Sequence, residues 1–204
     1  MEMNMTTNSG EVYKIDLAVE KVTDVKNIIA AAETEDEMGC VLRFHLMLES
    51  LLLFYLEEKC QGEVGKYAKP PRDFGQKLGM ATAFGMPLQI AAVIHQINNM
   101  RNKLAHGHSP GIDKGDVKQL ARLVNLMSAI DAEFAPLEKR YISLPVKRPG
   151  EKITFGTDSP QIDFLISCIA FWGTALNTLV QEAALNKVRL QIEAQKSAAV
   201  AAPK

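Results

Sequence analysis

The sequence has little cysteine, with only Cys40, Cys60 and Cys168 in 204 residues. The three are widely spaced, and no two form the close pair that begins a zinc-binding or disulfide pattern. The sequence therefore predicts no metal site and no cofactor, and it favours a reducing compartment, with the cytoplasm as the expected location.

An excess of charge of one sign is also missing, because 23 lysines and arginines face 24 acids. This balance gives no overall basic signature for nucleic acid. Charge is nevertheless uneven: residues 59–77 and residues 101–122 each carry five bases against two acids. Two interpretations stay open for these stretches, namely solvated helix faces and local contacts to phosphate.

The amino terminus MEMNMTTNSG lacks the basic and apolar regions of a signal peptide. The longest apolar stretches are interrupted by charge, so we expect no transmembrane span and no membrane partner. Residues 1–12 are polar enough to predict a disordered start.

Helical periodicity dominates the rest of the chain, which predicts an all-α bundle in one domain over residues 13–195. The segment 35–59 is apolar on most faces and is expected to be central. Residues 143–160 predict a long loop with a short hairpin around 152–155, and residues 196–204 a frayed tail. The other expected helices cover residues 17–32, 73–83, 87–106, 116–141 and 160–193.

One helix end carries residues suited to phosphodiester cleavage. Arg101 grips phosphate oxygens as a permanent cation, and His106 exchanges protons near neutral pH. Together they suit metal-independent cleavage, in which an acid/base serves the 2′-hydroxyl and the leaving oxygen while a cation stabilises the transition state.

Their spacing sets a geometric condition. Five residues at 100° per residue place Arg101 and His106 about 140° apart around an ideal helix. They converge only if the helix unwinds at Gly107, or if a twofold dimer brings two copies of each to one cleft. Spacing alone is weak evidence, since roughly 0.4 such pairs arise by chance in this composition.

The context of the motif is more specific. The stretch from Phe74 to Pro87, then Ile94, Ile97 to Met100 and RNKLAHG from Arg101 to Gly107, resembles the core of HEPN domains. The resemblance covers about residues 37–135 and is strongest to the mannitol-operon-repressor-like branch. It implies a bundle of four or five helices that dimerises; the first helix and the 143–160 loop match nothing in that family.

The resemblance also implies site residues. Arg101, Asn102 and His106 correspond to the catalytic set of nuclease members, which cleave RNA without metal and act as toxins or antiviral effectors. Other members keep the fold as regulators. The sequence thus leaves two hypotheses. One is a homodimeric HEPN-type endoribonuclease that acts on RNA and has an antitoxin as its partner. The other is a non-catalytic regulator or interaction module that binds a regulatory protein partner.

Further residues are candidates for supporting roles. His45 and Glu49 lie at i and i+4, where they either pair with each other inside the bundle or orient Arg101. His108 is a loop residue that is either solvated or part of the site. The candidate RNA contacts are Lys66, Lys69, Arg72 and Lys103, with Tyr67 and Phe74 available either for packing or for stacking on bases.

Overall fold

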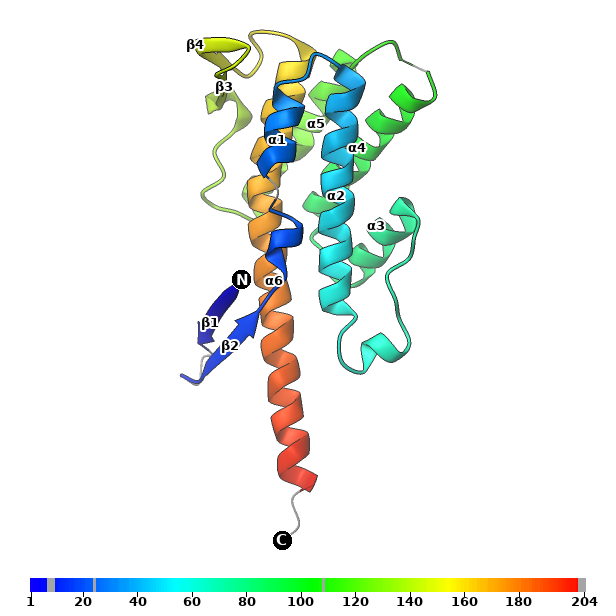
Figure 1. The fold of residues 1–204 in the computed structure, drawn as a ribbon, viewed down its shortest axis with the longest axis vertical. Helices are drawn as coiled ribbons and strands as arrows, with labels where there is room; N and C mark the ends of the chain where they lie inside the picture. The colour runs from blue at the N-terminus through cyan, green and yellow to red at the C-terminus, as the bar shows by residue number, and fades with distance from the viewer. Residues whose placement is uncertain (7–9, 24, 108, 202–204) are drawn as a thin grey trace.

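The computed structural model describes residues 1–6, 10–23, 25–107 and 109–201. This part of the chain is mostly helical, with two antiparallel hairpins, which confirms the predicted helical class (Figure 1). The helices are α1 (Val25–Ala32), α2 (Glu37–Lys59), α3 (Phe74–Ala83), α4 (Leu88–Ala105), α5 (Lys114–Asn125) and α6 (Pro160–Ala201), with short 3-10 turns at Val19–Lys21, Val64–Lys66, Leu126–Ala129 and Leu137–Lys139. The strands are β1 (Glu2–Thr6), β2 (Val12–Asp16), β3 (Tyr141–Leu144) and β4 (Arg148–Thr154).

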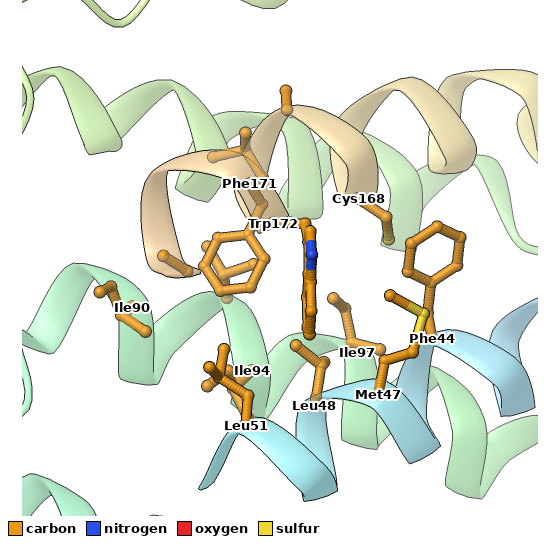
Figure 2. Close-up of a cluster of buried hydrophobic side chains, with 14 of the residues drawn as sticks. Phe44, Met47, Leu48, Leu51, Ile90, Ile94, Ile97, Cys168, Phe171 and Trp172 are labelled. Atoms are coloured by element: carbon orange, nitrogen blue, oxygen red, sulfur yellow. The ribbon is translucent and has the colours of Figure 1, made fainter. Parts of the chain in front are cut away.

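The core lies where α2, α4 and α6 meet. Figure 2 shows Phe44 and Leu48 of α2 and Ile94 of α4 facing Phe171 and Trp172 of α6. All five side chains are buried. The predicted central helix is confirmed, because the apolar residues of α2 contact neighbours on several sides.

Two helices are long and apolar enough to cross a membrane by length and composition, namely α2 and the stretch Pro160–Ala198 of α6. Of their apolar windows, 61% and 67% respectively are buried inside the bundle. Core helices of a folded bundle pass the same test, so the expectation of no transmembrane span stays a prediction.

The predicted disordered start is wrong for the described residues. Strands β1 and β2 pair in register from Glu2 opposite Asp16 to Thr6 opposite Val12. Tyr13 and Ile15 alternate into the core, and β2 contacts α6. Burial of this alternating face stabilises the hairpin, so polar composition alone misjudged it.

Three further boundaries differ. The helix expected from residue 17 begins only at Val25, and the one expected over 116–141 ends at Asn125. Asn125 explains the second difference, because its Oδ1 accepts from the amide of Leu137 at 3.0 Å and folds the chain back. The tail expected to fray from residue 196 continues as α6 to Ala201. The β3–β4 hairpin spans Tyr141–Thr154, so it begins before the loop predicted at 143–160 and is longer than the hairpin predicted around 152–155.

Candidate functional site

The motif lies on the last turns of α4. Pro87 precedes the helix with an extended ψ of 134°, and His106 is its C-cap. Gly107 has φ +67°, a left-handed conformation that favours glycine, and its amide donates to the carbonyl of Leu104 at 3.1 Å. The helix therefore ends in a regular cap and leaves the His106 side chain exposed.

Arg101 faces the α2 side of α4 and is half-buried. Its Nη1 donates to Oδ1 of Asn102 at 3.0 Å. Its Nε is buried and has no hydrogen-bond partner in the described part of the chain. Nor does any carboxylate there form an ion pair with the guanidinium, so its positive charge is not neutralised by a nearby acid.

His45 on α2 is close enough to Arg101 to feel its charge. Its Nε2 lies 3.0 Å from Oδ1 of Asn98, and its ring stacks on Phe74 with centroids 4.2 Å apart. Burial lowers the pKa of His45 below 6.5, and the Arg101 charge lowers it further, although the Asn98 contact opposes them. A neutral imidazole next to Arg101 adds no second positive charge.

Glu49 takes a different partner from those expected. Its Oε1 accepts from Nζ of Lys77 on α3 at 2.6 Å, and Lys77 is buried. The predicted pairing of Glu49 with His45 or Arg101 is therefore replaced by a salt bridge between α2 and α3. This bridge fixes the helix that holds Phe74 against His45.

His106 lies on another side of α4, which faces α5. An open hollow of about 470 Å³ is lined there by Gln96, Asn99, Asn102, Lys103, His106 and Asp116. Lys103 donates to both carboxylate oxygens of Asp116, at 2.7 and 2.8 Å. The lysine charge in this hollow is therefore largely balanced by Asp116.

Asn102 is a neighbour of both Arg101 and His106. Its side chain accepts from Arg101 and also lines the hollow that contains His106. Arg101 itself does not line that hollow. One copy of the chain thus brings Arg101 together with Asn102 and His45, and brings His106 together with Asn102 and Lys103. His108 lies outside the described residues.

The other predicted RNA contacts lie away from the motif. Lys66 pairs with Glu63, whereas Lys69 and Arg72 are exposed and form no ion pair within the described ranges. Figure 1 places the turn at Val64–Lys66 at the opposite end of the bundle from the end of α4. Tyr67 is 90% exposed and accessible to a base, whereas the Phe74 ring stacks on His45.

Sequence reasoning missed Asn98, Asn99, Lys77 and Asp116. Helical spacing applied to polar residues finds part of this set, because Asn99, Asn102, Lys103 and His106 recur at steps of three, one and three. Lys77 and Asp116 come from other helices, and no local pattern marks them. Among the described residues, no group of three or more His, Cys, Asp or Glu side chains is arranged to hold a metal ion.

Comparisons with family models, with curated proteins and with solved structures found no match for this chain.

Proposed function

We propose that this protein is a metal-independent endoribonuclease of the HEPN type that acts as a homodimer in toxin or antiviral biology. His106 serves as general acid/base: it takes the proton of the attacking 2′-hydroxyl or returns one to the leaving 5′-oxygen. Arg101 stabilises the charge that develops on the phosphoryl oxygens, and Asn102 positions the phosphate.

The state of Arg101 carries this proposal. A half-buried guanidinium normally pairs with a carboxylate, because an unbalanced charge in a partly desolvated site is costly. Among the described residues, the Arg101 side chain has only the neutral amide of Asn102 as a hydrogen-bond partner, and its Nε has none. A phosphate group offers the paired oxygens that a guanidinium fork binds best.

The placement of His106 adds a condition. An exposed imidazole on a hollow is accessible to RNA, but Arg101 does not line the same hollow. Asn102 alone joins the two within one copy. The proposal therefore requires that Arg101 of one copy act with His106 of another, or that RNA bridge both sides of α4.

The exposed segment 63–72 supplies the most accessible contacts for the rest of the RNA. Tyr67 is 90% exposed, and Lys69 and Arg72 are exposed near it in the sequence. An exposed ring between cations is suited to stacking on an unpaired base. We therefore favour single-stranded RNA as the substrate class.

Cleavage of a fluorophore-quencher RNA in the presence of EDTA tests the proposal. His106→Ala and Arg101→Ala should each lower the rate about a hundredfold or more. The matched control is His95→Ala, since His95 is exposed on the same helix but lines no part of the hollow. Equal cleavage by wild type and His106→Ala would refute the assignment.

The regulator hypothesis is the second candidate, and a specific observation favours it. Arg101 and His106 lie on different sides of α4 in one copy, and Lys103 is balanced by Asp116. Such a surface suits a protein partner as well as RNA. Overexpression separates the two: toxicity removed by Arg101→Ala or His106→Ala supports the nuclease, whereas harmless wild type supports the regulator.

A further inference from the structure

Beyond its first turn, helix α2 exposes one narrow stripe of side chains. Between Cys40 and Glu58 the only exposed residues are Arg43, Leu46, Ser50, Leu53 and Glu57. They recur at steps of three, four, three and four, so they fall within about 80° of one another around an ideal helix. We call these five residues the α2 seam.

The seam combines exposed leucines with opposite charges at its two ends. Leu46 is 60% exposed and Leu53 is 37% exposed, with the small Ser50 between them. Arg43 precedes this apolar centre and Glu57 follows it, each seven residues from Ser50. A stripe with this spacing is the pattern by which one helix packs along another.

The symmetry of the seam identifies its partner. When a second copy of α2 lies antiparallel across Ser50, Leu46 of one copy approaches Leu53 of the other. Arg43 then faces Glu57 of the second copy, and twofold symmetry makes this ion pair twice. A parallel arrangement would instead place Arg43 beside Arg43 and Glu57 beside Glu57. We propose that the α2 seam is the surface through which two copies of this chain associate in antiparallel orientation.

The seam matters for the motif because of where α4 lies. Figure 1 shows α3 and α4 on one side of α2 and α1 and α6 on the other. In an antiparallel pair the twofold axis lies in the interface, perpendicular to both α2 helices. Rotation about this axis keeps the helices on each side of α2 on that same side of the dimer. Both copies of α4 therefore face the same edge of the dimer. The inference bears on the proposed nuclease, which needs two copies, but α2 alone carries it.

Sedimentation velocity over a range of protein concentrations, without RNA, tests the seam. The wild type should form a dimer, and Leu46→Glu should weaken it by about a hundredfold or more. The matched control is Leu185→Glu, because Leu185 on α6 is 57% exposed and lies outside the seam. A wild type that stays monomeric, or a dimer that Leu46→Glu leaves intact, would overturn the proposal.

Charge reversal tests the orientation. Arg43→Glu and Glu57→Arg should each raise the dimer dissociation constant about tenfold, because each creates two like-charged pairs. The variant carrying both changes should recover wild-type affinity. If the combined variant is weaker than either single change, the antiparallel register is wrong.

Disulfide trapping gives an independent readout of the register. In a Cys60→Ser background, Ser50→Cys should crosslink to itself, because Ser50 lies at the proposed axis. Arg43→Cys should crosslink with Glu57→Cys but not with itself, which a parallel dimer would reverse. If the wild type forms this dimer but cleaves no RNA, the result counts against the proposed nuclease and not against the α2 seam. The two proposals can therefore fail separately.

Discussion

The Glu49–Lys77 salt bridge offers a sharp test of how the site is supported. Glu49→Gln should lower the free energy of unfolding by about 2 kcal/mol. Removing one member of a buried pair costs about 3–5 kcal/mol. We expect less here because one third of the Glu49 side chain is exposed and water screens the charge, whereas the Lys77 side chain is only 9% exposed.

Urea denaturation at constant m-value measures this loss. Lys77→Met should cost under about 1 kcal/mol, because it removes the buried charge and leaves a carboxylate that water can reach. The double variant should resemble Lys77→Met alone, since it contains no unpaired buried cation. A Glu49→Gln loss below about 0.5 kcal/mol would show that the bridge contributes little.

The same variant separates two roles for Glu49. Its 2.6 Å partner is Lys77 rather than Arg101, so we expect Glu49→Gln to keep its RNA cleavage rate wherever it remains folded. A large loss of rate in folded Glu49→Gln would mean instead that this carboxylate orients Arg101.

Three further predictions concern charge and exposure near the motif. Asp116→Asn should free Lys103 from its ion pair and raise the affinity for RNA severalfold at low salt, as measured by fluorescence anisotropy. Unchanged affinity would show that RNA does not contact the hollow. Since the folded protein lowers the pKa of His45 below 6.5, the unfolded chain takes up this proton first. The free energy of unfolding should therefore fall as pH drops below about 6.5, and less so in His45→Gln; parallel pH profiles would contradict this. Tyr67→Ala should weaken binding to single-stranded RNA by about 1 kcal/mol or more and leave duplex binding unchanged, whereas equal losses on both would argue against stacking.

Helical periodicity predicted the elements that build the core but not their irregular ends. The apolar residues of α2 and the glycine cap of α4 are local signals, and both helices formed where expected. The apolar stripe continues after Asn125 through Met127 and Phe134, which are both buried. This pattern predicts that the helix continues past Asn125. The structure instead buries Met127 on a 3-10 turn and Phe134 in the irregular segment that follows it, and Asn125 Oδ1 accepts from the amide of Leu137 beyond that segment.

The start of α2 illustrates why long-range contacts escape a sequence pattern. Thr34 and Glu37 have the spacing of a capping box, yet the helix begins at Glu37 with Asp36 as its N-cap. Glu37 instead accepts from the amide of Ile112 at 2.6 Å. This contact ties the segment after the motif to α2, and no local rule could assign a partner 75 residues away.

The candidate site was predictable to the extent that it is local. Arg101 and Asn102 are neighbours on α4, and their side chains form a hydrogen bond. The side that each residue faces depends on which helix packs there, with α2 behind Arg101 and α5 beside His106. Helix geometry predicts that Arg101 and His106 lie about 140° apart around α4. In the structure the two side chains accordingly have different neighbours within one copy.

This separation makes a mixed dimer the most informative experiment on the proposed function. A subunit with Arg101→Ala keeps its His106, and a subunit with His106→Ala keeps its Arg101. If each active site draws one residue from each copy, every mixed dimer regains one intact site of two. Mixing equal amounts and allowing exchange makes half the dimers mixed, so activity should recover to about a quarter of wild type. A site built within one copy leaves the mixture as inactive as its parts. Adding Leu46→Glu to both subunits should prevent mixed dimers from forming and abolish the recovery, so this variant tests the motif and the α2 seam together.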